Sequence, residues 1–169
     1  MSDVQRRQSR AWQAGRADAL SHGTTSEKIS SMLTMDPEEL IDNFEMLGSW
    51  EERYAYIIEL GREMPPLTDD ERTEANRVRG CMSQVWLVAD DDPGKLVFRG
   101  DSDAHIVRGL IALLRMLMSE RSPDEVRALD IGDIFGRLGL ENQITANRRN
   151  GFYAMVERIR AMAAERAAS

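Results

Sequence analysis

The sequence predicts an α+β fold in which a small three-stranded antiparallel sheet packs on helices. Several segments have apolar residues at helical spacing, and they flank a central pair of β-rich segments joined by a Pro-Gly turn. With 169 residues and 42% hydrophobic content, the chain can form one domain with a substantial core. Two strands alone are marginally stable, so we expect a short third strand near Arg77-Val78 and helices covering the sheet.

Two helices are predicted over residues 36–64. The first begins at Asp36, whose side chain can cap it, with Pro37 at the first helical position. The second begins after Ser49, because a glutamate follows this serine three residues later in the pattern of a capping box. It is expected to end near Gly61. The segment therefore predicts a helical hairpin.

A polar connector leads into a hairpin of two strands. Residues 85–89 (VWLVA) and 95–99 (KLVFR) are rich in β-branched and aromatic residues, and a DDDPG turn separates them. We expect the aspartates of this turn to be solvated and not to form a cation site. Asp101 and Asp103, just beyond the hairpin, are expected to cap the next helix.

Four further helices are predicted after the hairpin. An amphipathic helix covers about 102–120, a short one begins after Ser122, another begins at Ile131, and a long one covers about 145–167. The residues expected to face inward from the last helix are Phe152, Met155, Ile159 and Met162.

The chain divides into an N-terminal extension, residues 1–35, and a domain, residues 36–169. The composition of the extension predicts a disordered or loosely ordered tail. An organelle transit peptide and an initiation codon assigned too early are the alternatives. The whole chain has a formal net charge of −7. Because the extension carries +2, the domain carries −9. Because so acidic a domain repels phosphate backbones, we do not expect nucleic acid as a partner.

The sequence predicts neither membrane insertion nor secretion. The longest apolar run, residues 109–114, is too short to cross a bilayer, and no N-terminal segment has the pattern of a secretory signal. The single cysteine excludes an internal disulfide and fits a reducing compartment. A cytoplasmic location is therefore expected.

Cys81 is the main candidate for chemistry. Gly80 before it predicts a backbone turn, and Arg77 and Arg79 are expected to favour the thiolate, the reactive form of the thiol. The alternative is an unreactive cysteine in the core.

A lone thiol restricts the possible reactions. A cysteine hydrolase needs a placed histidine, but His22 lies in the extension and His105 at the solvated start of a helix. One cysteine and two histidines at unrelated spacing match no zinc pattern. Thiol–persulfide exchange needs no such helper, because its leaving group is itself a thiolate. That reaction fits best, with a thiol-dependent hydrolase or a plain interaction module as alternatives.

The segment GCMSQVW, residues 80–86, resembles the SufE family, which includes CsdE, at every fixed position of its G-C-x-S-Q-V-W motif. Further agreement lies in WEERY at 50–54, in GDSD at 100–103, and in Arg148 and Gly151, where the family has Arg-x-x-Gly. The resemblance runs from about residue 36 to the C-terminus.

The resemblance implies a fold shared with IscU-type scaffolds and an accessory protein rather than an enzyme. Cys81 is then expected to accept a persulfide from a SufS- or CsdA-like cysteine desulfurase, to stimulate that enzyme, and to deliver sulfur to an iron–sulfur scaffold complex. No cofactor of its own is expected, because the pyridoxal phosphate belongs to the desulfurase. Met82 predicts a loop that tucks the thiol against an apolar surface at rest and swings out on docking. The residues expected to support the thiolate or dock the partner are Arg148, Arg77, Arg79, Gly80, Ser83 and Gln84.

Overall fold

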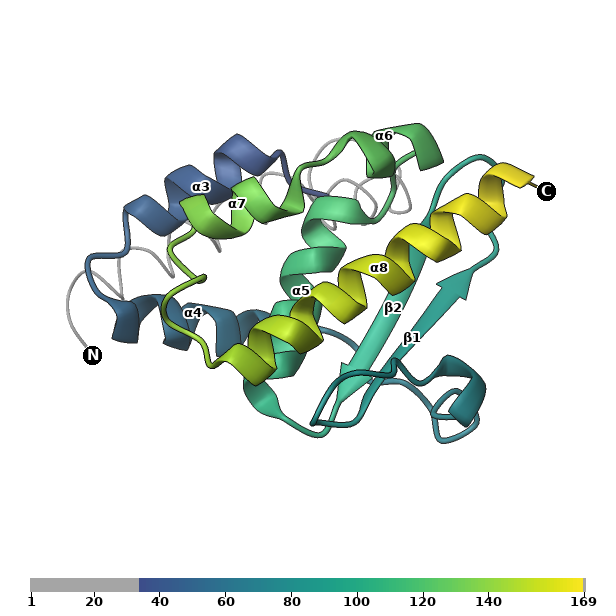
Figure 1. The fold of residues 1–169 in the computed structure, drawn as a ribbon, viewed down its shortest axis with the longest axis horizontal. Coiled ribbons are helices and arrows are strands. Elements are labelled where there is room, and N and C mark those ends of the chain that lie inside the picture. The colour runs from purple at the N-terminus through teal and green to yellow at the C-terminus, as the bar shows by residue number, and fades with distance from the viewer. Residues whose placement is uncertain (1–33, 169) are drawn as a thin grey trace, which may run out of the picture.

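A computed structural model describes residues 34–168, so the predicted extension lies almost wholly outside the described residues. Within them the fold is α+β, as predicted, with a two-stranded antiparallel sheet (Figure 1). The helices are α3 (Pro37–Glu45), α4 (Trp50–Glu63), α5 (His105–Met118), α6 (Pro123–Ala128), α7 (Ile131–Arg137) and α8 (Ala146–Ala168); a short 3-10 helix covers Glu74–Asn76, and the strands are β1 (Val85–Asp90) and β2 (Val97–Ser102).

Three helices begin at the caps that the sequence predicts. The side chains of Asp36, Ser49 and Ser122 each accept a hydrogen bond from a backbone N–H in the first turn of their helix, at 2.8, 3.2 and 3.2 Å. These hydrogen bonds satisfy N–H groups that have no partner within the helix. Because each one joins residues two or three positions apart, the sequence alone locates it.

Helix α5 forms the centre of the molecule. Eleven of its fourteen residues are buried, and it packs against α4, β2 and α8. Helix α8 runs diagonally across the molecule (Figure 1). The four residues predicted to face inward from it are all buried: Phe152, Met155, Ile159 and Met162.

The prediction that this helix ends near Gly61 is confirmed, because the last residue of α4 is Glu63. Gly61 itself lies inside the helix. Its role is to let α4 and α5 cross closely. A Cβ atom at Gly61 would lie 2.6 Å from the backbone nitrogen of Gly109, and one at Gly109 would overlap the carbonyl oxygen of Ile57. Only bare backbone fits at this crossing.

The predicted third strand is absent from the described residues. Strands β1 and β2 pair in a register that joins Val85 to Ser102. Before β1, only Arg77 forms an isolated bridge, with Trp86, and the N–H of Val78 donates to Val85 at 2.8 Å. The pairing stops there because Gly80, at a φ of +91°, turns the chain away from the sheet.

The second strand, Val97–Ser102, lies further along the chain than the predicted residues 95–99. The predicted helix start near residue 102 and the predicted caps at Asp101 and Asp103 are therefore wrong as well. Because Ser102 belongs to β2, α5 begins only at His105, and its N-cap Ala104 has no side-chain hydrogen bond. Asp101 is buried on β2, and Asp103 accepts a hydrogen bond from the backbone of Gln84 at 3.0 Å. Neither aspartate caps the helix.

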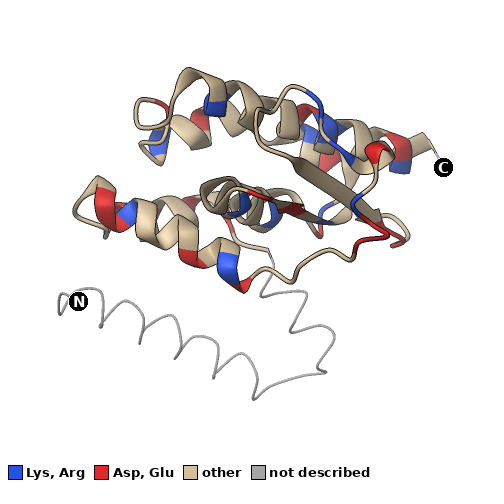
Figure 2. Ribbon diagram, turned by 90° about the horizontal axis from the view of Figure 1, so that it is seen from below, with Lys and Arg blue, Asp and Glu red and all other residues tan. Residues whose placement is uncertain are grey.

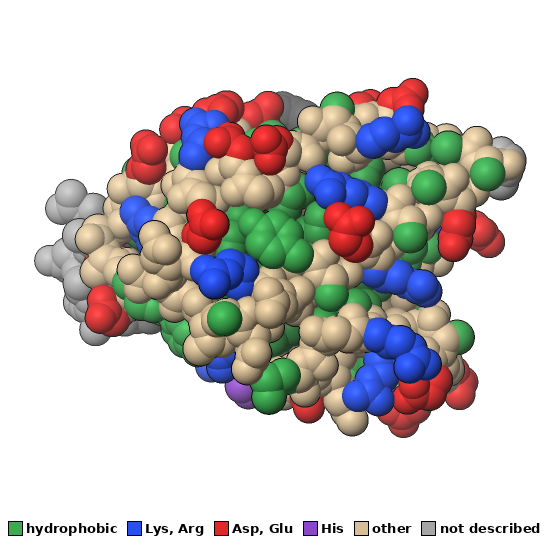
Figure 3. All heavy atoms as spheres, in the orientation of Figure 1, with side chains coloured by type: hydrophobic (Ala, Val, Ile, Leu, Met, Phe, Trp, Pro, Cys, Tyr) green, Lys and Arg blue, Asp and Glu red, His purple; other side chains and the backbone are tan. Residues whose placement is uncertain are grey.

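The acidic hairpin turn is bound by α8 instead of being only solvated. The guanidinium of Arg166 donates to the backbone oxygens of Asp90 and Asp92 and lies 3.7 Å from the carboxylate of Asp91. More widely, acidic and basic residues lie next to one another along the helices (Figure 2). On the face seen in Figure 3, basic side chains form no continuous surface.

Candidate functional site

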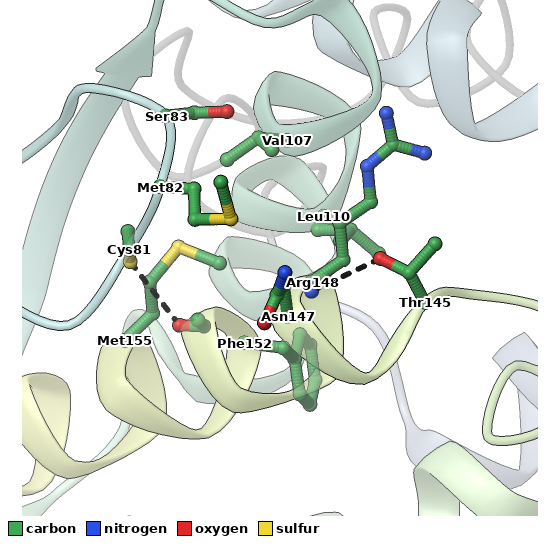
Figure 4. Close-up of a pocket in the computed structure, with 11 residues that line it drawn as sticks. Cys81, Met82, Ser83, Val107, Leu110, Thr145, Asn147, Arg148, Phe152 and Met155 are labelled. Atoms are coloured by element: carbon green, nitrogen blue, oxygen red, sulfur yellow. Dashed lines mark hydrogen bonds between the residues drawn. The ribbon is translucent and has the colours of Figure 1, made fainter.

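Cys81 lies in the turn that joins Val78 to β1, immediately after Gly80. Its side chain is half-buried and lines a pocket of about 300 Å³ between this turn, α5 and the start of α8 (Figure 4). Its lining combines apolar and polar side chains. The residues that line it are Cys81, Met82, Ser83, Val107, Leu110, Thr145, Asn147, Arg148, Gly151, Phe152 and Met155.

The thiol of Cys81 rests on α8. Its Sγ donates a hydrogen bond to the backbone oxygen of Gly151 at 3.4 Å, drawn as a dashed line in Figure 4. A Cβ atom at position 151 would lie 3.3 Å from the same Sγ. Gly151 was noted in the sequence only as part of the Arg-x-x-Gly match, and its contact with Cys81 could not be inferred from that spacing.

The surroundings of Cys81 in this state favour the protonated form of its thiol over the thiolate. Burial raises the pKa of the Cys81 thiol above that of an ordinary cysteine. Arg77 does not favour the thiolate in this state, because it forms an ion pair with Glu74 at 3.2 Å. The thiolate is therefore less favoured while the thiol lies in the pocket than it is in an exposed cysteine.

The arginines on either side of the thiol have no partner within residues 34–168. Arg79, in the turn, and Arg148, in the first turn of α8, are both exposed. Among the arginines in residues 34–168, Arg79 and Arg148 are the two whose guanidinium groups form no hydrogen bond or ion pair. The guanidinium of Arg148 extends away from Cys81 (Figure 4). In this state both guanidinium groups are therefore open to solvent.

The backbone of Gln84 fixes the far end of the turn that carries Cys81. Its oxygen accepts hydrogen bonds from the Oγ of Ser102 at 2.7 Å and from the N–H of Asp103 at 3.4 Å. Its own N–H donates to the carboxylate of Asp103 at 3.0 Å. Ser83 is half-buried at the rim of the pocket. Gln84 thus acts through its main chain.

Asp101 joins the segment before the turn to β2 and α5. Its carboxylate accepts hydrogen bonds from the N–H of Leu67 at 3.2 Å and from Arg72 at 2.7 Å, and lies 3.3 Å from Arg108. Burial alone would raise the pKa of Asp101, but the hydrogen bonds from Arg72, Leu67 and the N–H of Ser102, with the charge of Arg108, lower it below its usual value. The carboxylate therefore stays charged and holds these elements together.

Neither a catalytic histidine nor a metal site accompanies the thiol in the described residues. His105 is exposed at the start of α5 and does not line the pocket. No group of three His, Cys, Asp or Glu side chains in residues 34–168 could hold a metal ion. In the same residues, no helix has the length and apolar character needed to span a membrane.

Comparison with known proteins identifies the family of the chain. Residues 38–163 match the family model of SufE, described as the Fe-S metabolism associated domain. The chain belongs to the SufE family. An uncharacterized SufE-like protein of Rhizobium etli is 46% identical over 136 residues, covering 78% of this chain and 92% of the relative. One of Rhizobium meliloti is 43% identical over 130 residues, covering 75% of this chain and 93% of the relative.

A solved structure shows the same SufE-like fold. The solution structure of a hypothetical protein from Thermus thermophilus matches with a TM-score of 0.66 and 26% identity. The match covers 79% of this chain and 96% of that protein. Membership of the SufE family associates the chain with iron–sulfur metabolism.

Proposed function

We propose that the protein accepts sulfur on Cys81 from a cysteine desulfurase, stimulates that enzyme, and delivers the sulfur to iron–sulfur cluster assembly. The observation that carries the proposal is the placement of the chain's single cysteine in the family's G-C-x-S-Q-V-W motif, half-buried at a pocket that no histidine among residues 34–168 lines. A site of this kind lacks a base for hydrolysis but suffices for exchange between thiols and persulfides.

The transfer begins with a persulfide on the desulfurase. The Cys81 thiolate attacks the outer sulfur, so that a new S–S bond forms on Cys81 as the donor's S–S bond breaks. The donor cysteine leaves as a thiolate and is reprotonated, and no net oxidation or reduction occurs. The pyridoxal phosphate that releases sulfur from cysteine belongs to the desulfurase.

The resting geometry requires a movement before this attack. The thiol is half-buried and donates to Gly151, so it must leave the helix and lose its proton. Met82 is already 83% exposed beside it and supplies an apolar contact for the incoming partner. Docking is expected to draw the turn out and to expose Cys81 to the donor persulfide.

Sulfur transfer is tested by incubating the protein with a cysteine desulfurase, pyridoxal phosphate and cysteine, followed by mass spectrometry of the intact chain. The expected result is a gain of one sulfur atom on the wild type and none on Cys81→Ser. Desulfurase turnover is expected to rise with the wild type only. A wild-type chain that binds the desulfurase but gains no sulfur would contradict the proposal.

The alternatives make different predictions in simple assays. A thiol-dependent hydrolase would turn over a reporter ester and lose activity in His105→Ala. A plain interaction module would bind its partner equally well as Cys81→Ser and would not need the thiol for any effect. His105 is exposed and lies outside the pocket, so it is poorly placed to exchange a proton with Cys81.

A further inference from the structure

Gly151 occupies a position where glycine is unfavourable for the helix itself. It lies inside α8, and glycine is the weakest helix former after proline. Its backbone conformation does not require glycine, because the glycines with positive φ in the described residues are Gly80, Gly94 and Gly139. The reason for a glycine at position 151 must therefore lie outside the helix.

The space beside Gly151 is filled by Cys81. A Cβ atom on Gly151 would lie 3.3 Å from the Sγ of Cys81, 3.6 Å from its Cα and 3.7 Å from its Cβ. The first of these contacts is closer than ordinary van der Waals contact, so any side chain there would displace the sulfur. Gly136, inside α7, offers a comparison: the nearest atom to a Cβ there is a flexible glutamate oxygen at 3.5 Å.

The backbone oxygen of Gly151 is also a hydrogen-bond partner for the protonated thiol. It accepts the hydrogen bond from Cys81 at 3.4 Å, and a carbonyl oxygen can only accept. The arrangement is favourable for the S–H form and repulsive for the thiolate. One residue therefore provides both the space for the sulfur and a partner for its proton.

The turn approaches α8 at a second point, close to the first. A Cβ atom on Gly80 would lie 3.5 Å from the Cβ of Ala154, which follows Gly151 by about one helical turn. The turn before Cys81 thus rests on a strip of small residues, and the seat of the thiol on α8 is part of a continuous contact.

We infer that Gly151 is a positioning residue for Cys81: its bare backbone seats the protonated thiol on α8 and so limits its reaction with other molecules before a partner docks. The inference rests on the proposed function, in which Cys81 is the sulfur acceptor. In that setting the seat prevents the thiol from reacting with stray electrophiles or disulfides between transfers.

The first test measures alkylation of Cys81 by iodoacetamide in Gly151→Ala, with Gly136→Ala as the matched control. In Gly151→Ala the rate at neutral pH should rise about threefold, because the displaced sulfur keeps only a weakened hydrogen bond to the backbone oxygen that alanine retains. The midpoint of the rate against pH should fall toward that of an unstructured cysteine. Gly136→Ala should match the wild type in both. An unchanged rate and midpoint in a folded Gly151→Ala chain would overturn the inference.

The second test is a double-mutant cycle of Gly151→Ala with Cys81→Ala, read as thermal unfolding. Alanine favours the helix, but the contact with Sγ opposes it in the wild-type background. Gly151→Ala should therefore raise the unfolding temperature more in the Cys81→Ala background than in the wild type. Equal changes in both backgrounds, or failure of both Gly151→Ala chains to fold, would show that the glycine serves something other than the thiol.

These tests are independent of sulfur transfer, because no desulfurase takes part. If alkylation and unfolding follow the expectation but the wild type gains no sulfur from a desulfurase, the positioning role of Gly151 is supported and the proposed function is contradicted. If the wild type gains sulfur but Cys81 in Gly151→Ala is alkylated at the wild-type rate, the proposed function is supported and the positioning role of Gly151 is contradicted.

Discussion

The carboxylate of Asp103 accepts a hydrogen bond from the backbone N–H of Gln84 at 3.0 Å, and so ties the corner between β2 and α5 to the turn that carries Cys81. The N–H of Asp103 returns a weaker hydrogen bond to the oxygen of Gln84 at 3.4 Å. This pair of contacts holds the turn at one end, while the thiol itself holds it on α8.

Loosening this contact should expose the thiol. In Asp103→Ala the loss of one hydrogen bond to a charged acceptor should raise the alkylation rate of Cys81 about threefold to tenfold. Alkylation is followed by mass spectrometry at fixed pH. Asp124→Ala removes an exposed carboxylate whose ion pair within the described residues is with Arg127, so it is the control and should leave the rate unchanged. Equal rates in both variants would show that Asp103 does not restrain the turn.

The reactivity of Cys81 should depend on pH in a defined direction. Because burial raises the pKa of its thiol, the folded chain should reach half of its maximal alkylation rate at a higher pH than the chain unfolded in urea. Because the thiol has a higher pKa in the folded chain than in the unfolded chain, it stabilises the fold at pH values below its unfolded-state pKa. This stabilisation is lost as the pH rises through its folded-state pKa. Coincident midpoints for folded and unfolded chains would contradict a seated thiol.

The two exposed arginines beside the thiol should act in docking. Arg79→Ala and Arg148→Ala should each weaken binding to a cysteine desulfurase about threefold to tenfold, with unfolding temperatures unchanged. The loss should shrink at high salt, since salt screens exposed charges. Arg127→Ala removes an exposed arginine that is paired with Asp124 and serves as the control. Binding is measured by titration calorimetry, and wild-type affinity in both variants would remove the docking role.

Asp101 should be the costliest of the acidic residues to replace. Asp101→Asn leaves Arg72 and Arg108 without their shared buried carboxylate and should lower the free energy of unfolding by about 2–4 kcal/mol. Asp69→Asn removes a fully exposed partner of the same Arg72 and should cost under about 0.5 kcal/mol. Urea unfolding measures both. Equal losses would mean that burial of Asp101 is unimportant.

Acid should destabilise the fold through Glu71 and Asp101. Hydrogen bonds from Arg99, followed by one from the backbone of Thr68, lower the pKa of Glu71 to about 2, and that of Asp101 is also lowered. A carboxyl group whose pKa is lower in the folded chain stabilises the fold at pH values above its unfolded-state pKa. This stabilisation is lost as the pH falls through its folded-state pKa. The urea midpoint should therefore drop between about pH 5 and pH 2.5, less steeply in Glu71→Gln. The same slope in both chains would exclude Glu71 as a contributor.

Most elements could be predicted from the sequence because their signals are local. The caps at Asp36, Ser49 and Ser122 involve neighbours two or three residues away, and each helix starts where its cap predicts. The errors fall where distant segments decide the outcome. The end of α4 near Gly61 could be predicted, but the close crossing of Gly61 with Gly109 on another helix could not. Asp101 has the appearance of a cap, but Arg72 and Arg108 draw it into the interior.

The sequence by itself determined that one cysteine stands in a family motif with no second thiol beside it, and it located the helices on either side. Only the tertiary structure decided the state of that cysteine. Cys81 meets Gly151 across seventy positions of chain, and the burial around the thiol raises its pKa, whereas the neighbouring arginines in the sequence predict the opposite shift. The physical reason is that charge and solvation at a side chain depend on which atoms surround it, and chain folding brings those atoms from far away in the sequence.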